Sequence, residues 1–236
     1  MSAKRTGTGP DETVVQLQAG PVTLEGNLAV PNGAGGIVVF AHGSGGGRFS
    51  PRNRYVAGEL RNTGLATLLF DLLTEKEEAV DEVTRELRFD IDLLAERMVT
   101  ATEWVKRTPD IAALNLGYFG ASTGAAAALV AAATLPDEVA AVVSRGGRPD
   151  LAAPHLGSVK APTLLIVGGW DEPVIEMNRS AMARMSCEKE LVIVPGATHL
   201  FEEPGKLEEV ARLASDWFAH HLGGADRDSH SVGGEA

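Results

Sequence analysis

The feature that most restricts the fold is the regular alternation of short apolar runs with longer helical patterns. The later runs are rich in β-branched residues and apolar on both faces, which is typical of strands buried in a parallel sheet. They cover residues 36–41, 66–70, 116–119, 140–144, 163–167 and 191–194. Strands that alternate with helices need right-handed crossovers, so we predict a doubly wound α/β fold with a mostly parallel sheet flanked by helices.

Two earlier runs have a different pattern. Residues 13–17 and 22–29 alternate apolar and polar side chains and are separated by Ala19-Gly20-Pro21. This alternation indicates strands with one solvent-facing side, so we predict an antiparallel hairpin at one edge of the sheet. Elsewhere the helical spacing of apolar residues predicts helices over 52–62, 83–105, 125–134, 174–185 and 207–218.

The length of 236 residues and the apolar content of 44% suit one α/β domain with a sizeable core. We place this α/β domain at residues 13–222. A flexible N-terminus is expected at 1–12 and a disordered tail, small and polar, at 223–236. The connection 145–162 is too short for a helical lid, so we expect no cap domain. The segment after Asp71 could fold over a functional site at the edge of the sheet.

The formal net charge of −11 restricts the partners. An acidic protein is repelled by nucleic acid and by anionic membrane surfaces, so we expect neither as a partner. The single cysteine, Cys187, cannot form an intramolecular disulfide, which suits a reducing compartment. The chain has no apolar leader core, no run long enough to span a bilayer, and no CxxC or histidine-rich cluster. We therefore expect a cytoplasmic protein without a cofactor or metal ion.

The pentapeptide Gly120-Ala-Ser122-Thr-Gly124 matches G-x-S-x-G. It follows a predicted strand and opens a predicted helix, which is the setting of a nucleophile elbow, a sharp turn that lifts a serine hydroxyl above the sheet. A Cβ atom at Gly120 or Gly124 would collide across such a turn, so glycine fits both positions. The alternative is an ordinary strand-to-helix turn with a capping serine. The context favours the elbow, with Ser122 as the nucleophile.

A serine hydroxyl needs a base to take its proton, and the base needs a carboxylate to fix its tautomer. In this arrangement the acid and then the histidine follow the serine, each on a loop at the carboxyl end of a strand. Asp171 follows the predicted strand 163–167, and His199 follows the predicted strand 191–194. We therefore predict a catalytic triad of Ser122, Asp171 and His199.

Each partner of the serine also has a plainer interpretation. Asp171 could cap the helix that begins near Pro173, and Glu172 is a neighbouring alternative acid. His199 could be a surface histidine with no chemical role. Four other histidines do not follow a predicted strand: His155, His220, His221 and His230.

The loop at residues 42–48, HGSGGGR, follows an early strand and exposes backbone N–H groups that could stabilise an oxyanion. We assign the two donors of the oxyanion hole to the N–H groups of Thr123 and Ser44, with Gly45 as the backup for Ser44. His42 is expected to support the loop and not to act as a base. A glycine-rich loop can instead cradle phosphate, but this one lacks the G-K-[ST] ending and the G-x-G-x-x-G spacing.

Arginines near these residues could hold an anionic part of the substrate. Arg48 ends the glycine-rich loop and Arg145 ends a predicted strand, so both, together with Gly45, are candidate substrate-binding residues. Arg52 and Arg54 could serve the same purpose, although the solvated start of a helix is their plainer interpretation.

With these residues in place, the chain resembles the α/β-hydrolase superfamily and, within it, the small capless proteins similar to dienelactone hydrolases. The motifs that carry the resemblance run over most of the chain: AHGSGGGRFSPRNRYVA, LLFDLLTEKEE, GYFGASTGAAAAL, VVSRGGRPDL, LLIVGGWDEPV and VPGATHLFEEPG. The resemblance implies that Ser122, Asp171 and His199 are nucleophile, acid and base. Dienelactone hydrolases proper are similar to this chain but have cysteine as the nucleophile, where this chain has Ser122. In this chain, Arg145 and Arg148 are the positions that could serve as the substrate-binding arginines of that family.

The sequence therefore predicts a serine hydrolase that cleaves a small-molecule ester, thioester or lactone through an acyl-enzyme on Ser122. Two alternatives stay open, a non-catalytic ligand-binding protein that kept the fold and an acyltransferase whose acceptor is not water. Small hydrolases often pair, so a homodimer also stays open.

Overall fold

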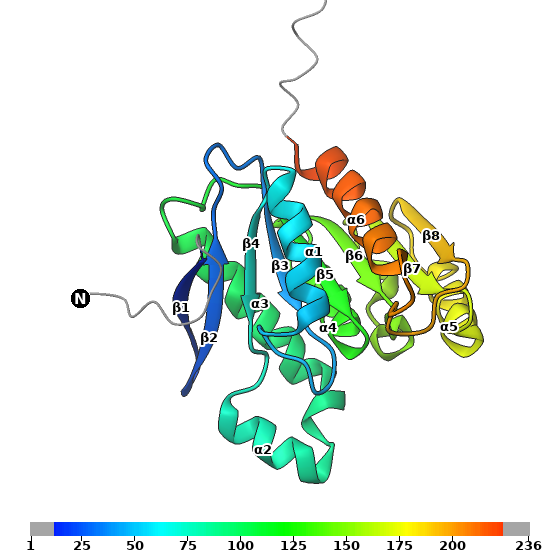
Figure 1. Ribbon diagram of the computed structural model, residues 1–236. Coiled ribbons are helices and arrows are strands. Elements are labelled where there is room, and N and C mark those ends of the chain that lie inside the picture. Colours follow the sequence, from blue (N-terminus) through cyan, green and yellow to red (C-terminus); the bar gives the residue numbers. More distant parts are fainter. Residues whose placement is uncertain (1–11, 224–236) are drawn as a thin grey trace, which may run out of the picture.

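The computed structural model describes residues 12–223 and contains one eight-stranded sheet with helices on both faces (Figure 1). The strands are β1 (Glu12–Ala19), β2 (Val22–Ala29), β3 (Ile37–Ala41), β4 (Ala66–Phe70), β5 (Leu116–Ala121), β6 (Val139–Arg145), β7 (Thr163–Gly168) and β8 (Lys189–Val194). The helices are α1 (Pro51–Asn62), α2 (Glu75–Thr84), α3 (Ile91–Arg107), α4 (Thr123–Thr134), α5 (Glu172–Met182) and α6 (Lys206–Leu222). Glu12, expected in the flexible N-terminus, is instead the first residue of β1. Residues 1–11 and 224–236, including His230, lie outside the described residues.

The sheet has the strand order β1-β2-β4-β3-β5-β6-β7-β8. The β1–β2 hairpin lies at one edge and pairs with β4 in the antiparallel sense, whereas all pairs from β4 to β8 are parallel. The prediction of a mostly parallel, doubly wound sheet with an N-terminal hairpin is therefore confirmed. The chain runs from β3 to β4 on one side and later to β5 on the other. This reversal places a crevice at the carboxyl ends of β3 and β5, where ligands bind in open α/β sheets.

Two layers of helices cover the sheet (Figure 1). Helices α1 and α6 bury Leu60 and Phe218 against one face, and α3 and α4 bury Met98 and Leu129 against the other. Within residues 12–223 the connection from β6 to β7 holds only two short 3-10 helices, η2 (Pro149–Ala152) and η3 (Leu156–Ser158), so it forms no cap domain. Nor does this part of the chain contain a helix that is both long and apolar enough to cross a membrane.

The single helix predicted over 83–105 was wrong. The structure ends α2 at Thr84, inserts the 3-10 helix η1 (Leu87–Phe89) and begins α3 at Ile91. Arg85 adopts a left-handed conformation with φ of 60°, which stops α2. The side chain of Asp90 accepts a hydrogen bond from the N–H of Leu93 and so caps α3. These local capping interactions override the continuous apolar spacing, and α2 is left as a separate helix at the carboxyl edge of the sheet.

Candidate active site

Ser122 lies between β5 and α4 in a conformation that L-residues rarely adopt, with φ of 51° and ψ of −121°. The surrounding backbone holds it there. The N–H of Ser122 donates to the carbonyl of Arg145 at 3.3 Å, and its own carbonyl accepts from the N–H groups of Ala125 and Arg148, both at 3.1 Å. Strain that is held in place by several hydrogen bonds is typical of functional positions. The turn is therefore a nucleophile elbow in its geometry.

The two glycines of the elbow exclude side chains for different reasons. A Cβ atom at Gly120 would lie 2.4 Å from the Cα of Ala125, which is the predicted collision across the turn. A Cβ atom at Gly124 would lie 2.3 Å from the carbonyl oxygen of Ala41 and 2.4 Å from that of His42. The second glycine therefore lets α4 start directly against the end of β3, and it does not relieve the turn itself.

The predicted acid and histidine meet at the carboxyl ends of β7 and β8. Nδ1 of His199 lies 2.6 Å from Oδ2 of Asp171. Asp171 occupies the N-cap position of α5, but its side chain makes no capping hydrogen bond. The carboxylate thus engages the imidazole and not the helix start. Because the proton on Nδ1 is donated to the carboxylate, Nε2 is left as the nitrogen that can accept a proton.

Ser122 and His199 line the same cavity, which has a volume of about 300 Å³. The imidazole packs against the chain after β6, where a Cβ atom at Gly146 would lie 3.5 Å from Nδ1 of His199. Arg145 is the partner of Ala121 in the β5–β6 register, so this chain segment runs beside the elbow. No group within residues 12–223 forms a hydrogen bond with the Ser122 hydroxyl, so the structure brings serine and histidine to one cavity without a direct bond between them.

The two predicted oxyanion donors also come together. Thr123 is the first residue of α4, and its hydroxyl lies 3.3 Å from the hydroxyl of Ser44. A Cβ atom at Gly43 would lie 3.1 Å from the Cβ of Ser122, so the glycine-rich loop packs directly on the elbow. In the described part of the chain no backbone carbonyl accepts from the N–H of Thr123 or Ser44. Both N–H groups therefore lack a backbone partner beside Ser122, at the positive end of a helix.

His42 supports the loop, as predicted. Its Nδ1 lies 2.9 Å from the carbonyl oxygen of Gly43, and its Nε2 accepts from the N–H of Leu72 at 2.9 Å. The side chain is buried, and both ring nitrogens are used. It therefore joins the glycine-rich loop to the chain that follows β4 and has no free nitrogen to act as a base.

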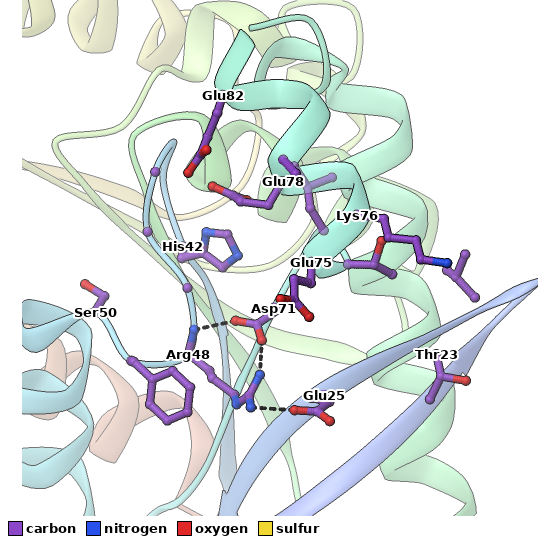
Figure 2. Close-up of a pocket in the computed structure, with 18 of the residues that line it drawn as sticks. Thr23, Glu25, His42, Arg48, Ser50, Asp71, Glu75, Lys76, Glu78 and Glu82 are labelled. Atoms are coloured by element: carbon purple, nitrogen blue, oxygen red, sulfur yellow. Dashed lines mark hydrogen bonds and ion pairs between the residues drawn. The ribbon is translucent and has the colours of Figure 1, made fainter. Parts of the chain in front are cut away.

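A larger cavity, of about 1060 Å³, is lined by the glycine-rich loop together with residues of β2 and α2 (Figure 2). Gly45 lines both cavities. Arg48 lines the larger one and forms ion pairs with Asp71 and, at 2.5 Å, with Glu25. The segment after Asp71 forms α2, whose acidic side chains line this larger cavity (Figure 2). The positive charge of Arg48 is thus balanced by two carboxylates.

Arg145 lines the smaller cavity together with Arg52. Burial, and to a lesser extent the nearby charge of Arg52, lowers the pKa of Arg145 to about 10. Arg52 pairs with Glu202 at 2.9 Å, and Arg148 pairs with Asp150 outside this cavity. Arg54 lines neither cavity, and the same holds for His155, His220 and His221. Residues 12–223 contain no group of three or more histidine, cysteine or acidic side chains placed to hold a metal ion.

A model of the dienelactone hydrolase family matches residues 24–222. The chain belongs to the dienelactone hydrolase family. A dienelactone hydrolase from Anabaena variabilis, known from a crystal structure, is 63% identical to this family member, with a TM-score of 0.88 over 90% of this chain and 99% of that one. A serine hydrolase without a lid from Xanthomonas campestris shares the fold, with a TM-score of 0.72 at 19% identity over 93% of this chain and 99% of its own.

Two curated relatives of this dienelactone hydrolase family member come from strains of Mycobacterium tuberculosis and carry the name putative phosphoribosyl transferase. Each is 61% identical over 210 residues, which are 89% of this chain and 46% of the relative. The chain thus spans about half the length of these relatives. The name applies to the longer proteins and does not say which half would carry that activity.

Proposed function

We propose that this α/β hydrolase cleaves a small-molecule ester, thioester or lactone through an acyl-enzyme on Ser122. The observation that carries the proposal is the 2.6 Å contact between His199 and Asp171 at the cavity that the strained Ser122 lines. An ionised carboxylate on Nδ1 orients the imidazole and stabilises its protonated form. The elbow holds the serine at the cavity that the imidazole also lines.

The proposed reaction has two halves. Oγ of Ser122 attacks the acyl carbon while Nε2 of His199 takes the serine proton and then gives it to the leaving group. Water then attacks the acyl-enzyme, with His199 as the base, and the acid product leaves as Ser122 regains its proton. Asp171 stays ionised throughout and holds the imidazole in place.

Negative charge develops on the acyl oxygen in both halves. The free N–H groups of Thr123 and Ser44 are the proposed donors to it, and one such donor typically contributes about 3 kcal/mol to the transition state. The close packing of the glycine-rich loop on the elbow fixes the distance between them. Because both donors belong to the backbone, substitution of either side chain would leave them in place.

Two other activities compete with hydrolysis. A ligand-binding protein would need no ordered acid–histidine pair beside a strained serine, so the geometry favours an enzyme. An acyltransferase would use the same acyl-enzyme with another acceptor. Product analysis with a competing alcohol separates the two, because a hydrolase releases mainly the free acid. Phosphoribosyl transfer, named for the longer relatives, is not part of the proposal.

Labelling with a fluorophosphonate followed by peptide mass spectrometry tests the proposal. We expect one modified peptide, containing Ser122, and steady turnover of a simple aryl ester. Ser122→Ala should abolish both signals, whereas Ser158→Ala, in η3 and away from the cavity, should keep them. An unlabelled wild-type protein, or undiminished turnover in Ser122→Ala, would reject a serine mechanism.

A further inference from the structure

Strand β8 lies at an open edge of the sheet, although its sequence is typical of an interior strand. Among residues 12–223 it pairs with β7 alone (Figure 1). Residues 191–194 are apolar on both faces, the pattern of a strand that is buried in a parallel sheet. Leu191, Val192 and Ile193 are nevertheless only partly buried. An apolar edge strand of this kind is a place where another strand can add to the sheet.

The opposite edge, β1, has the chemistry expected of a strand that ends a sheet. Its exposed side chains are polar: Thr13, Gln16 and Gln18. The centre of β8 has no such protection. Its charged residues, Lys189 and Glu190, stand at its start, it contains no proline, and the β7–β8 register runs without a bulge. Of the two edges, β8 is therefore the one suited to a partner strand.

The backbone groups of β8 that face away from β7 follow from the parallel ladder. The N–H of Thr163 donates to the carbonyl of Glu188, and the N–H of Gly169 donates to that of Val194. Because hydrogen bonds to a parallel neighbour come from alternate residues, the even-numbered residues of β8 bond to β7. The odd-numbered residues point their N–H and C=O groups outward, without a backbone partner among residues 12–223: Lys189, Leu191 and Ile193.

We propose that β8 is an interaction surface for a second copy of this chain. The two β8 strands pair in the antiparallel sense about a two-fold axis at Leu191 and join the two sheets into one. Such a pairing uses the outward N–H and C=O groups of both strands, and it leaves no β8 edge free for a third copy. The assembly is therefore a closed dimer, and it does not depend on the chemistry proposed for Ser122.

Charge decides the register of the pair. An axis at Lys189 or at Glu190 would set that charged side chain opposite its own copy, which is destabilising. An axis at Val192 would set Lys189 opposite Pro195, which has no N–H to donate. With the axis at Leu191, Glu190 lies opposite Val192, so no like charges meet. In this register every outward backbone group of the strand also finds a partner.

An exposed tryptophan lies at the same edge of the sheet. Trp170 is 68% exposed, and a Cβ atom added at Gly196, just after β8, would lie 3.8 Å from its ring. Tryptophan is enriched at protein interfaces. In an antiparallel pair the carboxyl end of one β8 lies beside the amino end of the other, so Trp170 borders the second copy.

Sedimentation velocity of the full chain tests the pairing. At about 50 µM we expect a species of twice the chain mass of 24.7 kDa, which dissociates on dilution with a dissociation constant in the micromolar range. Hydrogen exchange gives a second measurement that needs no substitution. Peptides that cover residues 189–194 should exchange more slowly above the dissociation constant than below it, whereas peptides from β1 should exchange alike at both concentrations.

Two substitutions at one position test the register. Val192→Glu sets an acid opposite Glu190 at both symmetric contacts and should weaken the dimer about 10-fold or more. Val192→Lys sets opposite charges there and should bind about 10-fold more tightly than Val192→Glu at low salt, a difference that shrinks at high salt. Both place a charge at the same partly buried position, so their cost to folding is similar. Adding Glu190→Lys to Val192→Glu should restore the dimer.

Thr13→Glu, at an exposed position of β1, is the control and should leave the dissociation constant unchanged. A chain that stays monomeric at about 100 µM rejects the proposal. Equal dissociation constants for Val192→Glu and Val192→Lys at low salt reject the β8 pairing, as does a dimer that Thr13→Glu disrupts. Species larger than a dimer, or a dimer in which residues 189–194 gain no protection, also overturn it, because they assign the contact to another surface.

Discussion

The two cavities that the glycine-rich loop lines differ in how they treat an arginine. In the larger one Arg48 is neutralised by Asp71 and Glu25 (Figure 2). In the smaller one the Arg145 side chain has no partner among residues 12–223. The larger cavity has more than three times the volume, yet Ser122 and His199, which carry the proposed function, line the smaller one. If the proposed function holds, cavity size is a poor guide to the active site of this protein.

The largest expected effect is the difference in kcat between variants of two aspartates. Asp171 contacts His199, which lines the smaller cavity, and Asp71 lines the larger one. Asp171→Asn should lower kcat by about 10⁴-fold, because an amide cannot hold His199 in the tautomer that leaves Nε2 free. Asp71→Asn should change kcat less than about 3-fold, since Asp71 pairs with Arg48 and touches no reacting atom. Steady-state kinetics with an aryl ester measure both. A large loss of kcat in Asp71→Asn would place the chemistry at the larger cavity and contradict the proposed site.

A second contrast concerns how rigidly each cavity is built. Gly124→Ala would press a methyl group onto two backbone carbonyls, 2.3 and 2.4 Å away, and should destabilise the fold by about 3 kcal/mol. Gly47→Ala meets only the side-chain oxygen of Asp71, at 3.0 Å, which can move aside, so it should cost less than about 1 kcal/mol. Urea denaturation of the two variants measures the difference. Equal losses would mean that the elbow is no more constrained than the loop beside it.

The third prediction is that replacing an arginine by methionine changes the stability of the protein in opposite directions at the two cavities. Arg48→Met should destabilise the protein by about 1–2 kcal/mol, because it leaves Asp71 without its ion pair, although Asp71 keeps a hydrogen bond from the N–H of residue 48. Arg145→Met should stabilise it. Melting curves of both variants at neutral pH test the contrast, and two shifts of the same sign would remove it.

Much of the fold could be predicted because local patterns and the packing of the sheet agree. Strand-to-loop transitions placed Ser122, Asp171 and His199 in order, and the parallel sheet brings such loops to one edge. The break between α2 and α3 was missed although its signals were present. Asp90 is a typical N-cap residue, and Thr74 and Glu77 form a capping box at the start of α2.

The partners of the arginines could not be predicted from sequence. Arg48 pairs with Glu25 from β2 and with Asp71 after the end of β4, and the sequence around Arg48 predicts neither partner. Arg48 and Arg145 both lie at the end of a strand or loop, so the sequence pattern did not distinguish them. Charge pairing across a sheet depends on tertiary distances, so only the structure separates a neutralised arginine from a free one.

The smallest expected effect, below about 1 kcal/mol, tests whether Arg145 is charged and unpaired in the folded protein. Its pKa is lowered to about 10 by burial and by Arg52, against an ordinary value of 12.5. The unfolded chain therefore binds this proton more tightly, so the charge costs stability below about pH 10 and costs less as the pH rises through that value. Arg145→Met lacks the group, and its stability advantage over the wild type should shrink between about pH 8 and about pH 10.5. Urea denaturation of both proteins at the two pH values measures this, and the other titrating groups are common to both and cancel in the difference. An advantage that stays constant or grows with pH would show that a partner balances the Arg145 charge, and the contrast between the two arginines would then disappear.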